Sequence, residues 1–171
     1  DWTLRTFLLH QYPGGSFDGG NFTAAGNVAP YGFYNRFSLA TWVKPRKGTG
    51  ALVTRAKDIE EEAGYGLYLK DGKVQANFIV RWLDDCLRVE TEEAIPLNEW
   101  THVAMSYDGT RIADGVKIYL NGKPARLRYI VDDLNQNFQV KEPLRLGGGN
   151  GQRFDGELQD VRVYNEVLTP R

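Results

Sequence analysis

The segment WTHVAMSYDG, from Trp100 to Gly109, holds a histidine, a serine and an aspartate within seven residues. These residue types, His102, Ser106 and Asp108, are those of a hydrolase's base, nucleophile and orienting acid. The alternate residues between them are mostly apolar, and the run ends in Asp-Gly. This pattern predicts a half-buried β-strand followed by a turn. Along one strand, His102 and Ser106 lie roughly 13 Å apart, whereas a nucleophile and its base must come within about 3.2 Å. The spacing therefore excludes a catalytic triad.

Cleavage of a glycosidic bond is a second chemistry to consider, and a retaining mechanism needs two carboxyl groups about 5 Å apart. The nearest constellation is KDIEEEAG, where Asp58, Glu60 and Glu62 alternate. No apolar residue between Glu60 and Glu62 would hold this stretch in a sheet, and runs of charge usually mark exposed segments. The stretch is therefore predicted to be a solvated loop, with at most a turn or two of helix before Gly64.

The strongest candidate for ligand binding is RWLDDCLR, at the junction of two predicted strands. Trp82 offers a flat apolar face of the kind that stacks on sugar rings, while Arg81, Asp84 and Asp85 can hydrogen-bond hydroxyl groups or bind a cation. The alternative is that Trp82 fills the core and the charges mark a turn, because large aromatic side chains are usually buried. Two aspartates alone do not make a calcium site, which needs about six to eight oxygen ligands.

Other residues that can do chemistry favour structural roles. Cys86 is the only cysteine, which excludes an intrachain disulfide and a cysteine-based zinc site, and it is predicted to be a buried apolar filler. Trp42 and Trp100 fall in strand patterns that predict core positions. The run GGGNG at 147–151 precedes a turn and a strand, whereas a phosphate-binding loop leads into a helix.

The elements that must position these residues are predicted to be β-strands. Seven Asp-Gly or Asn-Gly steps suit tight turns, and those at Asp71 and Asn121 give the clearest hairpins. Helical periodicity is nearly absent. Regularly spaced strands predict an all-β, two-sheet antiparallel sandwich or jelly roll. The predicted strands are 36–43, 51–55, 65–70, 73–82, 87–91, 100–107, 115–120, 125–131, 143–147 and 157–164.

Composition limits the organisation and the partners. A chain of 171 residues, 42% hydrophobic and 25% charged, fits one domain over 1–171 with a substantial core. Its 21 basic and 22 acidic residues form no basic block, which argues against binding to nucleic acid. No apolar run approaches about 18 residues, so membrane insertion is not expected. The chain begins at Asp1 without a methionine, and we expect it to be a piece of a larger protein.

Seven motifs in order carry a family resemblance from Phe17 to Pro170. The chain resembles the laminin-G-like, concanavalin A-like lectin/glucanase domains of bacteria. It is most similar, through RWLDD, VKIYLNGKP and KEPLRLGGG, to the domain embedded in large secreted bacterial proteins that also carry a c-type cytochrome module. No Cys-x-x-Cys-His is present, so any haem part would lie outside this chain. The motifs are FDGGNF, RFSLATWVKP, GLYLKDGKV, LNEWTHVAMSYDGT, VKIYLNGKPA, PLRLGGG and FDGELQDVRVYNEVLTP.

The resemblance implies a convex and a concave sheet, with the concave face or edge loops binding glycans or proteins. It also implies a structural Ca²⁺ held by Asp18 and Asp160, although Gln159 stands where the family usually has an acidic residue. No other cofactor is expected. We expect an extracytoplasmic location, with other domains of the parent chain as partners. Because fold does not settle function, three hypotheses remain: a non-catalytic binding module, which we favour, an architectural spacer without a ligand, and a glycan-cleaving enzyme.

Overall fold

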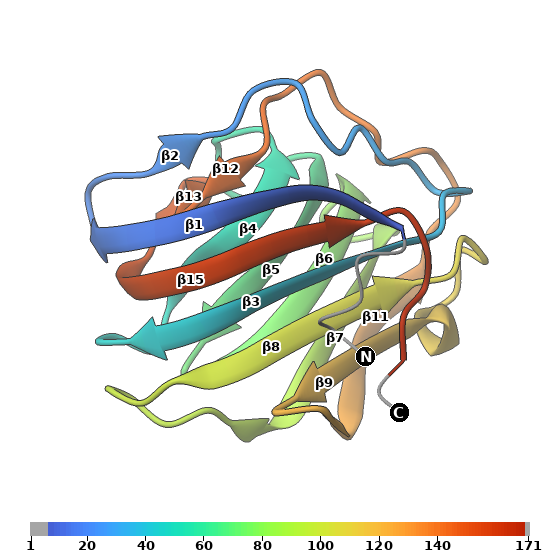
Figure 1. Ribbon diagram of the computed structural model, residues 1–171. Coiled ribbons are helices and arrows are strands. Elements are labelled where there is room, and N and C mark those ends of the chain that lie inside the picture. The colour runs from blue at the N-terminus through green and yellow to red at the C-terminus, as the bar shows by residue number, and fades with distance from the viewer. Residues whose placement is uncertain (1–6, 170–171) are drawn as a thin grey trace.

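The computed structural model describes residues 7–169 as two antiparallel β-sheets packed face to face, so the all-β sandwich prediction is confirmed (Figure 1). The six-stranded sheet runs in the order β1 (Leu8–Asp18), β15 (Asp155–Tyr164), β3 (Phe37–Pro45), β8 (Thr101–Tyr107), β9 (Val116–Leu120) and β10 (Lys123–Pro124). The seven-stranded sheet runs in the order β11 (Leu127–Asp133), β7 (Asp85–Ala94), β6 (Lys73–Arg81), β5 (Gly64–Lys70), β4 (Gly50–Ala56), β12 (Arg145–Leu146) and β2 (Thr23–Ala24).

Two small elements complete the described chain. The hairpin of β13 (Gly148–Gly149) and β14 (Gln152–Arg153) packs beside β4, and a 3₁₀ turn, η1 (Ala113–Gly115), precedes β9. Residues 57–63 between β4 and β5 form turns and bends without a helix, as the acidic run predicted. No helix among residues 7–169 is long and apolar enough to cross a membrane.

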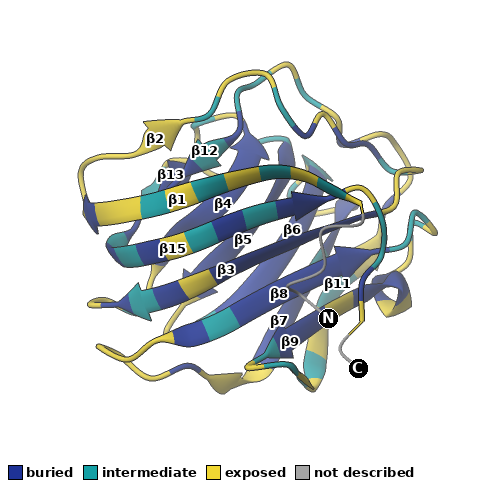
Figure 2. Ribbon diagram, in the orientation of Figure 1, coloured by how far each residue is buried: buried dark blue, intermediate teal, exposed yellow. Residues whose placement is uncertain are grey.

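The core lies between the sheets, where side chains from both sheets pack together. Most residues of the central strands are buried (Figure 2). Its centre is aromatic: the Phe37 ring stacks on Tyr31 at 4.2 Å and meets Tyr65 edge-on at 5.0 Å. Phe78 and Phe138 close this cluster from β6 and from the segment after β11. Such rings prefer tilted and edge-to-face contacts, and their burial removes a large apolar area from water. The core therefore holds the two sheets together without a disulfide.

Both predicted hairpin turns are confirmed. Asp71 and Gly72, between β5 and β6, have φ of 51° and 79°. Asn121 and Gly122, between β9 and β10, have φ of 51° and 77°. Two consecutive residues with positive φ define the turn whose twist matches antiparallel strands, and Asn or Asp followed by Gly adopts it at low cost.

β1 is absent from the predicted strands, and it contains Pro13, Gly14 and Gly15, residue types that are rare in strands. The strand lies at the edge of the six-stranded sheet and pairs only with β15. An edge strand tolerates Pro13, which lacks a backbone donor. Gly14 has φ of 92°, and a Cβ there would lie 2.1 Å from the Leu158 carbonyl oxygen. Proline and glycine thus mark an irregular edge strand and not a loop.

The prediction that Trp42 and Trp100 fill the core is wrong. Their exposed fractions are 39% and 40%. Trp42 belongs to β3 but lies on the outer face of the six-stranded sheet, opposite in phase to the buried Leu39 and Val43. Strand periodicity identifies alternating faces but does not say which of them is covered.

Candidate functional site

The outer face of the seven-stranded sheet is recessed, and we call it the concave face. Its central outward-pointing side chains, Tyr68, Gln75, Asn77 and Glu90, are at most 6% exposed. A hollow of about 400 Å³ opens beside Gln75. Gly66, at the middle of β5, has no side chain on this face, and a Cβ there would lie 2.8 Å from Thr54 Cγ2, so the neighbouring strand β4 packs closely against it. The side chains that line this hollow are mostly polar or charged.

Strand register arranges these polar groups into one chain of hydrogen bonds. Asn77 Nδ2 donates to Gln75 Oε1 at 3.4 Å, and Gln75 Nε2 donates to Glu90 Oε2 at 2.7 Å. Arg128, directly opposite Glu90 on β11, donates to Glu90 Oε1 at 3.3 Å. The buried Asn77 Oδ1 and Tyr68 Oη have no hydrogen-bond partner among the described residues. Buried polar atoms are normally paired, so these two are exceptions, and neither residue lines the hollow.

The charge state of Glu90 bears on catalysis. Burial opposes its ionisation, but the hydrogen bonds from Gln75 and Arg128 outweigh burial and lower the pKa of Glu90. A glycosidase's general acid needs a raised pKa. Glu90 is therefore better suited to the role of a fixed hydrogen-bond acceptor than to that of a proton donor.

Trp82 lies at the end of the concave face and lines the hollow together with Arg88. It is half-buried and stands outside the core, and its ring stacks on the Arg88 guanidinium, whose central carbon is 3.5 Å from the ring centroid. The alternative interpretation, a core-filling Trp82, is wrong. Its role as a sugar platform stays a prediction.

The three charged residues predicted beside Trp82 separate in the structure. Arg81 Nε pairs with Asp84 Oδ1 at 2.9 Å, and both side chains are more than 60% exposed beside the turn. Asp85 is fully buried, and its Oδ1 accepts the backbone N–H groups of Asn135 at 2.7 Å and Gln136 at 3.2 Å. The prediction that Asp85 binds ligand is therefore wrong, because its carboxylate anchors a loop of the protein.

The loop at 57–63 forms one wall of the hollow, which Glu60 and Glu61 line. Asn150, only 2% exposed, fixes this loop: its Oδ1 accepts the Glu61 N–H at 3.0 Å and its Nδ2 donates to the Glu62 carbonyl at 2.9 Å. Arg153 adds a bidentate pair with Asp58, at 2.9 and 2.6 Å. Sequence reasoning missed Asn150 and Arg153, although a lone asparagine inside GGGNG is a signal of a residue that binds backbone.

The pair of Asp58 and Arg153 predicts a pH dependence of stability. The hydrogen bond from Arg153 is the largest cause of a lowered pKa of Asp58. Because the folded pKa lies below the ordinary value of 3.8, the stabilisation is present above pH 3.8 and is lost as the pH falls through the folded pKa. We expect the melting temperature of Asp58→Asn to lie below that of the unmodified protein at about pH 6, with the gap narrowing below about pH 4. A gap that stays constant down to pH 2.5, measured by circular dichroism at about half-unit steps, would contradict this.

The predicted calcium pair, Asp18 and Asp160, does not form one site. Asp160 lies opposite residues 12–14 of β1, at least four residues from Asp18 and therefore roughly 13 Å or more along the strand. Its Oδ1 accepts hydrogen bonds from Gln11 and Arg162, while Asp18 Oδ1 accepts backbone N–H groups of its own turn. The prediction of these two residues as joint ligands is wrong. Among the described residues no three His, Cys, Asp or Glu side chains gather as a metal site.

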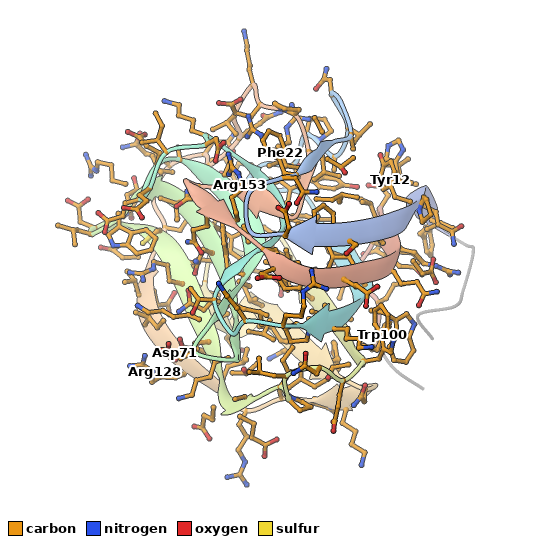
Figure 3. The ribbon with its side chains drawn as sticks, turned by 90° about the vertical axis from the view of Figure 1, so that its left-hand side faces the viewer. Tyr12, Phe22, Asp71, Trp100, Arg128 and Arg153 are labelled. Atoms are coloured by element: carbon orange, nitrogen blue, oxygen red, sulfur yellow. The ribbon has the colours of Figure 1, made fainter. Side chains whose placement is uncertain are left out.

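A second surface lies on the outer face of the six-stranded sheet. His102 packs edge-on against Trp42 with ring centroids 5.1 Å apart, and Lys44 lies 5.9 Å from the Trp100 ring. Figure 3 places Trp100 on the opposite side of the molecule from Arg128 and Asp71 of the concave face. His102 and Ser106 pair with different residues of an extended β3, so the exclusion of a triad is confirmed.

Comparison with curated proteins finds distant relatives that are far longer. Adhesion G-protein coupled receptor V1 of Danio rerio is 24% identical over 147 residues, which is 77% of this chain and 2% of the receptor. Usherin of Homo sapiens is 25% identical over 146 residues, which is 79% of this chain and 3% of usherin. The segment similar to this chain thus makes up only 2–3% of the length of these relatives.

Solved structures share the fold. The CBM40 domain of Ruminococcus gnavus IT-sialidase, bound to α2,3-sialyllactose, matches with a TM-score of 0.69 and 15% identity over 94% of each chain. Domains LG4-5 of mouse laminin α1 match with a TM-score of 0.62 and 14% identity over 91% of this chain and 41% of that one. A family model matches residues 17–171, nearly the whole chain. The chain belongs to the concanavalin A-like lectin/glucanases superfamily.

Proposed function

We propose that this domain is a non-catalytic glycan-binding module and that the sugar binds on the concave face. The observation that carries the proposal is the hollow of about 400 Å³, which is lined mostly by polar and charged side chains and has Trp82 at its end. Sugars are recognised by hydrogen bonds to hydroxyl groups and by apolar stacking on an aromatic ring. Gln75 and Gln152, which line the hollow, supply the first and Trp82 supplies the second.

The two alternative functions have less support. A spacer without a ligand would be expected to fill its concave face with bulky apolar side chains, whereas Gln75, Arg88 and Gln152 line an open hollow on this face. A glycan-cleaving enzyme needs a carboxylic acid with a raised pKa, and the pKa of Glu90 is lowered. The sialyllactose complex of the CBM40 domain supports the glycan class, because that domain shares the fold.

We further propose that the domain is one module of a larger extracytoplasmic protein. The adhesion receptor and usherin, of which similar segments form only 2% and 3%, support this organisation. A parent protein with a c-type cytochrome module stays a prediction from the sequence resemblance. Calcium binding through ligands other than the Asp18 and Asp160 pair also stays a prediction.

A glycan array followed by NMR titration tests the binding proposal. We expect an array hit to shift the backbone amide signals of β5, β6 and β7 and to leave those of β3 and β8 unchanged. The exposed Trp42 and Trp100 surface serves as the internal control, because it is the competing aromatic face. Shifts confined to β3 and β8 would move the site to that surface, and an array without a hit would favour the spacer.

A further inference from the structure

The concave face carries two hollows that meet. The first, of about 400 Å³, is walled by Glu60, Glu61 and the β13–β14 hairpin. The second, of about 250 Å³, lies toward the β11 edge, near Asp71 and Arg128 (Figure 3). Three residues line both hollows: Lys70, Gln75 and Arg88. The junction between the hollows is therefore the position that a ligand spanning the face must cross.

The cations around the two hollows differ in their partners. Arg153 is paired with Asp58 at 2.6 Å, and Arg128 is paired with Glu90 at 3.3 Å. By contrast, among residues 7–169 neither Arg88 nor Lys70 forms an ion pair or donates a side-chain hydrogen bond to a carboxylate. Among the described residues, the two cations at the junction thus have no carboxylate of their own, and the same holds for Lys73 in the second hollow.

Arg88 is the less solvated of the two. Burial is the main cause of a lowered pKa of Arg88, and its Nε is enclosed without a hydrogen-bond partner in the described part of the chain. Trp82 covers one face of the guanidinium at 3.5 Å. Removing a guanidinium from water is costly unless an anion compensates, and carboxylates match its planar fork of donors. The stacked ring also holds the guanidinium in one orientation, which lowers the entropy that a ligand must remove.

From this arrangement we infer that the glycan bound on the concave face is acidic and that its carboxylate is seated against Arg88 at the junction of the two hollows. The inference rests on the proposed glycan-binding function and specifies its ligand class. Glu61 and Glu90 are both close enough to Arg88 to stabilise its charge, and each repels such a ligand from its own side of the junction. The acidic group therefore belongs at the junction, with neutral sugar units extending over Gln75 and Trp82.

Matched glycans test this inference by isothermal titration calorimetry. The probes are oligogalacturonate, its carboxyl-reduced neutral counterpart and a sulfated counterpart of the same length. We expect the carboxylated chain to bind at least about tenfold more tightly than the reduced one. Arg88→Gln should remove that advantage, and Arg88→Lys should retain part of it. Glu61→Gln should strengthen binding of the acidic chain about twofold or more and leave binding of the neutral chain unaffected.

The outcomes separate this inference from the function on which it rests. Equal binding of the carboxylated and reduced chains, unchanged in Arg88→Gln, would overturn the acidic ligand and leave the glycan-binding module standing. Tighter binding of the sulfated chain than of the carboxylated chain would overturn the inference that the acidic group is a carboxylate. Absence of binding by every probe and every array glycan would remove both proposals. Circular dichroism of each variant checks that it is folded. If Arg88→Gln does not fold, the comparison with Arg88→Lys still tests the inference.

Discussion

Replacing Trp82 with alanine is expected to weaken glycan binding by about 10- to 100-fold, which corresponds to about 1.5–3 kcal/mol. The reason is that Trp82 supplies the aromatic surface at the end of the hollow, and it also orients Arg88 by stacking at 3.5 Å. Because the side chain is half-buried and outside the core, the free energy of unfolding should fall by no more than about 1 kcal/mol. Calorimetric titration of the array hit measures the first effect and urea denaturation the second.

Trp42→Ala is the matched control for this experiment. Trp42 has an exposed fraction of 39%, but it lies on the other sheet, so its loss should leave glycan affinity within about twofold. Weakened binding in Trp42→Ala with unchanged binding in Trp82→Ala would place the ligand on the six-stranded sheet. A loss of several kcal/mol of stability in Trp82→Ala would instead mean that the residue is part of the packing and not of the site.

Replacing Asp85 with alanine should have the opposite profile. Its buried carboxylate accepts the backbone N–H groups of Asn135 and Gln136, and the substitution leaves both donors without a partner. A buried, unsatisfied polar group costs about 1–3 kcal/mol, so we expect a loss of about 2–4 kcal/mol in the free energy of unfolding. The folded fraction should bind glycan with unchanged affinity, because the carboxylate faces the protein.

Two neighbouring variants control the Asp85 experiment. Asp84→Ala, at an exposed position, should change stability by no more than about 0.5 kcal/mol. Asp85→Asn keeps a side-chain oxygen acceptor and should recover most of the stability lost in Asp85→Ala. Weaker glycan binding by Asp85→Ala, with stability unchanged, would restore the original prediction that this residue touches the ligand.

The sequence alone determined the fold class and most strand positions. Alternation of apolar residues and the Asp-Gly and Asn-Gly turns at Asp71 and Asn121 are local signals, and local backbone chemistry decides them. The same reasoning excluded the triad, because strand rise fixes the spacing between His102 and Ser106. It also identified Trp82 as a residue of interest at the junction of two strands.

Only the tertiary structure decided which face each side chain occupies and which residues meet. Asp84 and Asp85 are adjacent in sequence, yet one is exposed and the other anchors a loop fifty residues away. Asn150 reaches the 57–63 loop, and Glu90 meets Gln75, through contacts between distant segments. Periodicity gives the phase of a strand, but burial depends on what packs over each face, and that depends on the pairing of strands far apart in the chain. For this reason strand propensity predicted the sandwich, whereas the set of residues that meet on the concave face required the structure.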